Sequence, residues 1–230
     1  MPPERHIIIG CLGDSLTDGC PGYSSYTQSG ADVQSQYQYW LQALVTEDFQ
    51  ALLDELRADL VFINRGACGE ITQQIKGRLY PEIIGHALRG FGRKPDVIII
   101  VGGTNDLGWG IGTGTIAANL MEMHACCRKE GVISMGASIP PTRFEGEPDY
   151  NSRKLGLNRE IAKFFTTQKI AWADLYTKMG DASDNGNLKP ALDAGDGLHF
   201  SVAGYRRMAE IIYEDGFREI LGALYSSMAG

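Results

Sequence analysis

The sequence contains no long apolar run. Its apolar stretches, such as Val97–Val101, are far shorter than the roughly 20 residues that a membrane-spanning helix requires, so we expect no membrane insertion. The first residues also lack the apolar stretch ending in small residues that marks a secretory signal. The expected location is therefore the cytoplasm.

Positive charge is also scarce. Lys and Arg number 21 against 28 Asp and Glu, which gives a net charge of −7. Proteins that bind nucleic acids need a basic surface that displaces counterions from the phosphates, so we expect no nucleic-acid partner. A small uncharged substrate remains compatible with this charge. The 230 residues show no linker or internal repeat, which predicts a single domain over residues 1–230.

Cysteine is present in an odd number and without the regular spacing of a disulfide framework. We therefore expect the five thiols to be free, as in a reducing compartment. No Cys-x-x-Cys pair occurs, and His124 lies near Cys126 and Cys127 on one predicted helix, which offers too few converging ligands for a metal. The sequence predicts no metal site.

Five short apolar runs rich in β-branched residues predict strands. Because their hydrophobicity is continuous rather than alternating, we expect both faces of each strand to be buried, as in a parallel sheet. Residues 116–127, 157–165 and 205–212 repeat apolar side chains at helical spacing, and Ser201 is a plausible N-cap for the last of these helices. This order predicts an α/β fold, a three-layer α/β/α sandwich. The expected strands are His6–Cys11, Leu60–Asn64, Val97–Gly102, Val132–Ser138 and Ile170–Leu175.

Three longer polar stretches are predicted to be loops: residues 17–36, 140–153 and 177–196. Loops on an α/β scaffold commonly carry the functional residues.

Polar and glycine-rich segments directly follow the first three predicted strands, and a fourth segment precedes the last helix. Because the carboxyl ends of parallel strands share one edge of the sheet, the first three segments must meet there. The four segments are Gly13–Gly19, Asn64–Glu70, Gly102–Asp106 and Asp196–Ser201.

These segments contain the groups that acyl transfer requires: a nucleophile, a base, a group that orients the base, and donors for the oxyanion. Ser15 lies in a glycine-flanked turn that can expose its hydroxyl. His199 is the candidate base, and Asp196, three residues earlier, can accept a hydrogen bond from its other ring nitrogen. Asn105 offers a neutral side-chain donor, and Gly69 offers a backbone N–H unobstructed by a side chain.

In kind and in order, the four segments resemble the signature blocks of the GDSL, or SGNH, hydrolase family. The resemblance covers residues 13–199, nearly the whole chain. It implies a flavodoxin-like sheet of five parallel strands. It also implies Ser15 as nucleophile, His199 and Asp196 as base and orienting group, and the amides of Ser15 and Gly69 with Asn105 as the oxyanion hole. No cofactor is implied.

The second block leaves the oxyanion glycine open between Gly66 and Gly69. Gly69 is preferred because the following Gly-Glu-Ile-Thr resembles the Gly-Asp/Glu-Thr of the family, although Ile71 is an insertion relative to that pattern. The Gly-x-Ser-x-Gly elbow of α/β-hydrolases is absent, since Leu16 and Thr17 follow Ser15.

Other residues in these segments have competing interpretations. Cys68 is a rival nucleophile, but a small inert side chain is the favoured reading. Asp14 and Asp106 are expected to brace turn amides, and Asp193 is expected to face solvent. Trp109 either lines the acyl pocket or covers an edge of the core.

The sequence therefore predicts a serine esterase or acyl hydrolase acting on a small-molecule ester, with short-chain and carbohydrate O-acetyl esters as candidate substrates. Two alternatives stay open: a catalytically silent ligand-binding domain on the same fold, and a nucleotide or flavin binder. The glycine-rich residues 110–114 do not follow a strand directly, which disfavours nucleotide binding. The acyl chain length, the natural substrate and the oligomeric state are not specified by these motifs.

Overall fold

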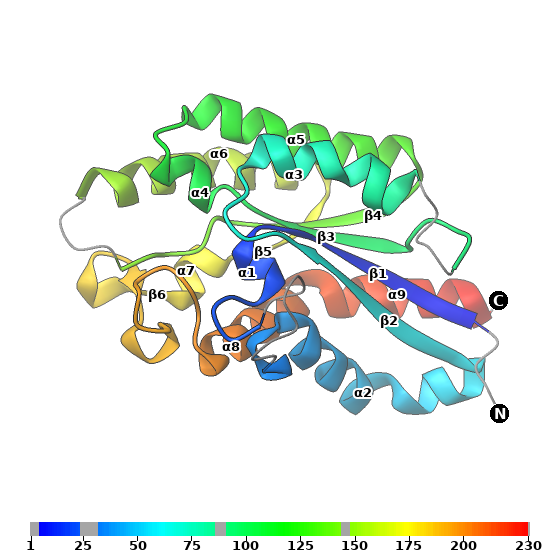
Figure 1. The fold of residues 1–230 in the computed structure, drawn as a ribbon. Helices are drawn as coiled ribbons and strands as arrows, with labels where there is room; N and C mark the ends of the chain where they lie inside the picture. The colour runs from blue at the N-terminus through cyan, green and yellow to red at the C-terminus, as the bar shows by residue number, and fades with distance from the viewer. Residues whose placement is uncertain (1–4, 24–31, 86–90, 144–147, 230) are drawn as a thin grey trace.

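The computed structural model describes residues 5–23, 32–85, 91–143 and 148–229. A five-stranded parallel sheet in the order β2-β1-β3-β4-β5 forms the middle layer, which confirms the predicted α/β sandwich (Figure 1). Its strands are β1 (Arg5–Gly13), β2 (Ala58–Gly66), β3 (Val97–Val101), β4 (Ile133–Ala137) and β5 (Ala171–Ala173).

Burial on both faces explains the continuous apolar runs. Along β3, Val97, Ile99 and Val101 pack into the core on one side of the sheet, whereas Ile98 and Ile100 pack into the core on the other. Side chains of a strand alternate between faces, so a strand that is covered on both sides must be apolar at every position.

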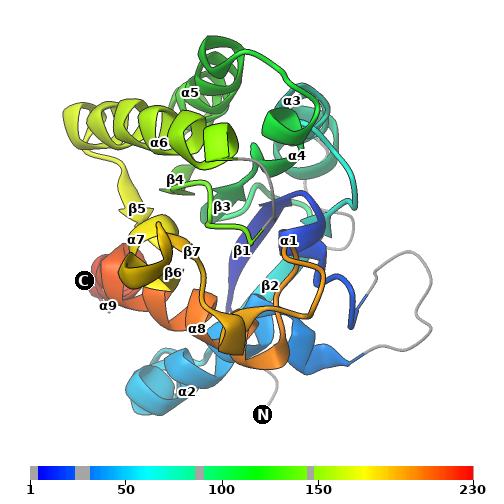
Figure 2. The ribbon, with the colours of Figure 1, turned by 90° about the vertical axis from the view of Figure 1, so that its left-hand side faces the viewer.

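Helices cover the two faces of the sheet. On one face lie α2 (Tyr37–Leu56), α8 (Val202–Ile212) and α9 (Arg218–Ala229), and on the other lie α3 (Thr72–Arg78), α5 (Thr113–Lys129) and α6 (Pro148–Gln168). Three short helices stand at the carboxyl edge of the sheet, as Figure 2 shows: α1 (Ser15–Asp18), α4 (Thr104–Gly108) and α7 (Leu175–Met179). None of the helices within the described ranges has the length and apolar content to cross a membrane.

Other short elements connect these units. Three are single helical turns of the 3₁₀ kind, η1 (Val33–Ser35), η3 (Ala182–Asp184) and η4 (Pro190–Leu192), and two are π-helical, η2 (Leu79–Ile84) and η5 (Tyr213–Phe217). A small antiparallel hairpin pairs β6 (Gly180–Asp181) with β7 (Asn187–Leu188).

The three predicted loops are only partly loops. Residues 148–153 belong to α6, residues 177–179 to α7, and residues 17–18 to α1. Polar side chains in these stretches led to the error, because α1 and α7 are too short to show an apolar stripe and the first residues of α6 are mostly polar. Residues 24–31 and 144–147, within two of the predicted loops, lie outside the described residues.

The expectation of five free thiols is wrong. Cys20 and Cys68 form a disulfide, with their Cα atoms 7.3 Å apart, whereas Cys11, Cys126 and Cys127 are free. The two partners are 48 residues apart in sequence. They meet because Cys20 follows β1 and α1, Cys68 follows β2, and β1 and β2 are neighbouring strands. The prediction of a reducing compartment rested on five free thiols, and the cysteines therefore no longer support it.

We predict that thiol titration with a chromogenic disulfide, in denaturant and without reductant, gives three thiols per chain. Prior reduction should raise the count to five. A Cys20→Ser/Cys68→Ser double variant is the control, because it should give three thiols under both conditions. Five thiols in unreduced wild-type protein would contradict the pairing.

Candidate active site

The ends of three neighbouring strands bring the predicted segments together. Gly13 at the end of β1 pairs with Gly66 of β2 and with Val101 of β3, so the three strands end at the same level. The fourth segment reaches this edge through the loop before α8, where Asp193 and Phe200 form an isolated antiparallel bridge. Figure 2 looks onto this edge.

Ser15 is the first residue of α1 and is buried, with 4% of its surface exposed. Asp14 is the N-cap, and its Oδ1 accepts a hydrogen bond from the Leu16 N–H at 3.0 Å. The first N–H groups of a helix have no partner within the helix. The Ser15 amide is thus a donor that α1 does not use.

Side chains from three other elements hold the carboxyl end of this four-residue helix. Gln38 Nε2 donates to the Thr17 carbonyl at 2.9 Å, and Asn64 Nδ2 donates to the Asp18 carbonyl at 3.0 Å. Just beyond the helix, Tyr205 donates its hydroxyl proton to the Cys20 carbonyl at 2.6 Å. Carbonyls at the end of a helix have no partner in the helix, so these bonds fix α1 and its first residue in place.

His199 connects to Ser15 on one side and to Asp196 on the other. Its Nε2 lies 3.0 Å from Ser15 Oγ, and its Nδ1 lies 2.6 Å from Asp196 Oδ2. A neutral ring that donates from Nδ1 to the carboxylate presents Nε2 as an acceptor for the serine hydroxyl. The three residues that the sequence singled out as nucleophile, base and orienting group are therefore in hydrogen-bond contact.

The environment of Asp196 favours its ionised form, although 49% of its side chain is exposed. Partial burial raises the pKa of this carboxyl. Hydrogen bonds from the His199 ring and from the backbone N–H groups of His199 and Leu198 outweigh that effect and bring the pKa below its ordinary value. The carboxylate is thus a competent acceptor for the imidazole.

Asp193 does not simply face solvent, contrary to the expectation. It is half-buried, and its Oδ1 accepts from the N–H groups of Gly195 at 2.8 Å and Gly197 at 3.0 Å. Gly195 and Gly197 both have positive φ, 106° and 74°, which only glycine adopts readily. Asp193 thus braces the turn, whereas the carboxylate at hydrogen-bond distance from the His199 ring is that of Asp196.

Asn105 is oriented by the loop after β2. Its Nδ2 donates to the Glu70 carbonyl at 2.8 Å. A primary amide has two N–H bonds, so the second stays available for a substrate oxygen. The same hydrogen bond ties Asn105 to the residue that follows Gly69.

The geometry distinguishes the two candidate glycines. Gly66 is buried, its N–H donates to Asn64 Oδ1 at 2.8 Å, and a side chain there would collide with the backbone of Asp18. Gly69 has φ +81°, is exposed, and would meet nothing within 4 Å of an added Cβ. Gly66 therefore serves close packing, and Gly69 fits the approach of a substrate.

Arg78 is a supporting residue that sequence reasoning missed. From α3 it donates to the carbonyls of Gly13 and Arg65, each at 3.0 Å, and pairs with the Glu70 carboxylate at 2.6 Å. It thereby joins the ends of β1 and β2 to the loop that holds Gly69. Its local ion pair with Glu82, four residues later, is an ordinary helix-surface pattern, and the partners that tie it to the site lie eight or more residues away.

The two acidic residues expected to be structural do brace turns. Asp106 accepts from the Thr72 N–H at 2.8 Å and from the Thr72 hydroxyl at 2.5 Å, which anchors the start of α3. Asp14 caps α1 and is fully buried. The pKa of Asp14 is raised to about 7, and burial is the main cause. The hydrogen bond from the Leu16 N–H acts in the opposite direction and lowers this pKa.

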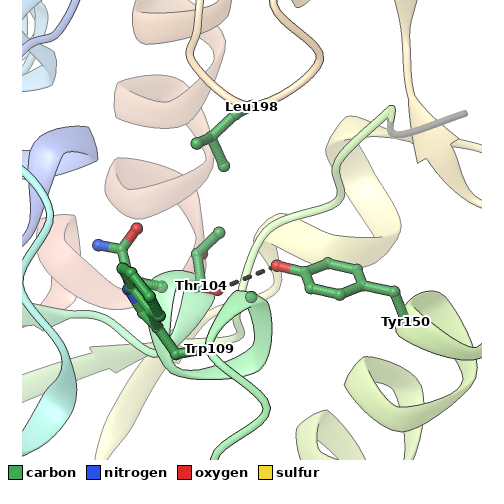
Figure 3. Close-up of a pocket in the computed structure, with 6 residues that line it drawn as sticks. Thr104, Trp109, Tyr150 and Leu198 are labelled. Atoms are coloured by element: carbon green, nitrogen blue, oxygen red, sulfur yellow. Dashed lines mark hydrogen bonds between the residues drawn. The ribbon is translucent and has the colours of Figure 1, made fainter. Parts of the chain in front are cut away.

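A cavity of about 260 Å³ lies beside Asn105. Trp109 forms part of its wall and is 76% exposed, so it lines this pocket rather than covering the core. Figure 3 shows Leu198, from the His199 loop, facing Thr104 and Trp109 across the opening. The complete lining is Thr104, Asn105, Gly108, Trp109, Tyr150 and Leu198.

Neither the alternative nucleophile Cys68 nor His124 has the surroundings that its alternative role would require. Cys68 is bonded to Cys20 and has no free thiol. His124 is buried with its Nδ1 2.9 Å from Ser134 Oγ, and burial lowers its pKa to about 3. Within the described ranges, three metal-ligating atoms gather within 4.8 Å only at Asp18, Cys20 and Cys68, where the two sulfurs are already bonded to each other.

We predict a pH-dependent effect of Asp14→Asn on stability. Between about pH 4 and pH 7 the unfolded chain loses the Asp14 proton while the folded chain keeps it, so wild-type stability falls as pH rises through this window. Asn has no such proton and is a good N-cap. The unfolding free energy of the variant, relative to wild type, should therefore rise from pH 4 to 7 and then level off. Denaturant titrations giving a constant or falling difference would contradict this.

Three solved structures share this fold. An acetylxylan esterase from Geobacillus stearothermophilus is 20% identical over 94% of this chain and 97% of its own, with a TM-score of 0.68. A lipase/acylhydrolase from Enterococcus faecalis is 22% identical over 94% and 96%, with a TM-score of 0.68. A GDSL-like lipase from Bacteroides thetaiotaomicron is 17% identical over 94% and 89%, with a TM-score of 0.63.

Sequence comparison gives the family. A search of curated protein sequences found no match. The model of the GDSL-like lipase/acylhydrolase family matches residues 11–207, which include all four segments at the carboxyl edge of the sheet. The chain therefore belongs to the GDSL-like lipase/acylhydrolase family.

Proposed function

We propose that the chain hydrolyses acyl esters, with Ser15 as nucleophile, His199 as general base and Asp196 as its orienting carboxylate. The observation that carries this proposal is the continuous line of contacts from Asp196 Oδ2 through the imidazole to Ser15 Oγ, at 2.6 and 3.0 Å. Nucleophile and base are within hydrogen-bond reach, and the base is held by a third group, which is the arrangement that activates a serine.

In the acylation step, Ser15 Oγ attacks the ester carbonyl carbon while its proton passes to His199 Nε2. The negative charge on the carbonyl oxygen is stabilised by the N–H groups of Ser15 and Gly69 and by the free N–H of Asn105. The carbon–oxygen bond to the alcohol then breaks, and His199 returns the proton to the leaving alcohol.

In the second step, water replaces the alcohol. His199 takes a proton from the water, the resulting hydroxide attacks the acyl carbon, and the same donors hold the oxyanion. The bond to Ser15 Oγ breaks, and the serine recovers its proton from His199. Acid is released and the free enzyme is restored.

We also propose that the pocket beside Asn105 binds the acyl group and that the enzyme prefers short acyl chains. The cavity of about 260 Å³ is lined mainly by apolar surface from Trp109, Tyr150 and Leu198. Its position between an oxyanion donor and the His199 loop fits the acyl side of an ester bound at Ser15. The acetylxylan esterase with the same fold acts on acetyl esters, which is compatible with this size.

The proposed nucleophile is tested by an organophosphonate, which reacts with activated serines and not with ordinary ones. We expect intact-mass analysis to show one adduct on the wild-type chain and none on Ser15→Ala. Ser183→Ala is a matched control, since Ser183 belongs to the η3 turn and should leave labelling unchanged. An adduct that persists in Ser15→Ala would place the nucleophile elsewhere.

The two carboxylates of the His199 loop should respond differently to the same substitution. Asp196→Asn removes the acceptor that fixes the imidazole, and we expect kcat/KM to fall by roughly 10- to 10³-fold. Asp193→Asn keeps an oxygen that can accept from Gly195 and Gly197, so it should retain near wild-type activity. Equal losses, or a larger loss in Asp193→Asn, measured on one ester, would show that the carboxylate roles are misassigned.

A chain-length series of p-nitrophenyl esters tests the acyl preference. We expect kcat/KM to be highest for acetyl to butyryl esters and to fall for longer chains. Trp109→Ala should shift the preference toward longer chains because it opens the wall of the pocket. Tyr80→Ala is the control, as another exposed aromatic residue away from the pocket lining. Faster hydrolysis of long-chain esters by the wild-type enzyme would exclude the proposed pocket.

A further inference from the structure

Lys154, on α6, is the most unusual polar residue outside the proposed catalytic groups. Its side chain is fully buried, with 0% of its surface exposed. Its Nζ donates a hydrogen bond to Thr142 Oγ1 at 3.0 Å and lies 4.6 Å from the centre of the Tyr150 ring. Within the described residues no carboxylate pairs with it.

Burying an amine without an opposite charge is costly. The desolvation lowers the pKa of Lys154 well below its ordinary value. An apolar side chain of similar length would fill the same space without this cost. The hydrogen bond and ring contact that the amine makes therefore explain its presence better than the packing of its side chain does.

One contact of Lys154 leads to the His199 loop. Thr142 belongs to the segment that follows β4, and its carbonyl accepts a hydrogen bond from the Leu188 N–H at 3.2 Å. The next residue, Arg143, donates its N–H to the Gly197 carbonyl at 2.7 Å. Gly197 lies between Asp196 and His199, and a side chain there would collide with the Arg143 carbonyl. Thr142 thus belongs to the segment against which the base loop rests.

The other contact leads to the oxyanion side. The Tyr150 hydroxyl donates to the Thr104 carbonyl at 3.0 Å, the bond drawn in Figure 3. Thr104 directly precedes Asn105, and Tyr150 lines the pocket together with Asn105 and Leu198. Lys154 therefore contacts Tyr150, and the Tyr150 hydroxyl in turn supports the α4 turn that carries Asn105.

We propose that Lys154 is a positioning residue, which holds the loop of His199 and Asp196 at a fixed separation from the turn of Asn105. It does so through Thr142 on one side and Tyr150 on the other. It touches neither substrate nor the reacting atoms. The inference rests on the proposed function, since it assigns Lys154 a role in aligning the base with the oxyanion donors.

Lys154→Met tests this role, because it keeps the length and volume of the side chain and removes the nitrogen. We expect kcat to fall about 10-fold or more with little change in KM, since a small misplacement of base and donors affects the reacting geometry more than binding. Phosphonate labelling of Ser15 should slow in parallel. The melting temperature should equal or exceed that of wild type, because the burial cost disappears. Lys163→Met, the same substitution at an exposed position of α6, is the matched control and should leave kcat, the labelling rate and the melting temperature unchanged.

Thr142→Val tests the same contact from the other side. We expect it to lower kcat by a similar factor, and the double variant to lose no more than either single one, because all three lack the same hydrogen bond. Should Lys154→Met fail to fold, Thr142→Val decides the question alone.

The outcomes separate this inference from the proposed function. A wild-type chain that hydrolyses no ester and is not labelled at Ser15 would overturn both. An active, labelled wild type whose Lys154→Met and Thr142→Val variants keep full kcat would overturn the positioning role only. Losses that add in the double variant would also overturn it, because the two residues would then act independently.

Discussion

Gly13 pairs with Gly66 on one side and with Val101 on the other, and this register determines where the functional residues can meet. Three parallel strands end side by side, so residues that follow them lie close in space although they are far apart in sequence. The alignment leaves no room for side chains: a Cβ at Gly13 would collide with the Val101 carbonyl, and one at Gly66 would collide with the backbone of α1. The turn that carries Ser15 therefore depends on glycine at both positions.

The site combines a buried half and a more exposed half. Ser15 is buried in a short helix whose capping groups come from Asp14, Gln38 and Asn64, and Arg78 fastens the strand ends beneath it. His199, the proposed base, lies on a surface loop shaped by glycines and braced by Asp193. Because a serine and an imidazole must meet within hydrogen-bond distance, the contacts that fix the loop matter as much as the catalytic side chains themselves.

The sequence allowed the sheet to be predicted and the proposed reacting groups to be selected because both are encoded locally. Strands buried on two faces are apolar throughout, as in Val97–Val101, and each motif that carries Ser15, Asn105 or His199 is a short contiguous block. The first turns of α6 were expected to be loop because their polar residues show no apolar stripe. Helix α2 was not anticipated, although its buried Tyr37, Leu41 and Val45 repeat at helical spacing.

What the sequence did not predict depends on contacts between distant segments. The Cys20–Cys68 pairing, the Arg78 contacts with Gly13 and Arg65, and the placement of Lys154 beside Thr142 each require the folded arrangement of strands and helices. Asp193 was expected to face solvent because it lies six residues before His199 in the sequence. The positive-φ glycines fold the loop back, so that the Gly197 N–H reaches the Asp193 carboxylate.

The central claim is that ester hydrolysis proceeds through a covalent bond between the substrate's acyl group and Ser15 Oγ. The most direct measurement mixes the enzyme with excess p-nitrophenyl ester, quenches with acid within milliseconds to seconds, and maps the acyl group by peptide mass spectrometry. We expect the peptide containing Ser15 to gain the mass of the acyl group, with a burst of nitrophenol matching the enzyme concentration wherever deacylation is the slower step. Turnover with no burst and an acyl group on another residue, such as a free cysteine, would contradict it.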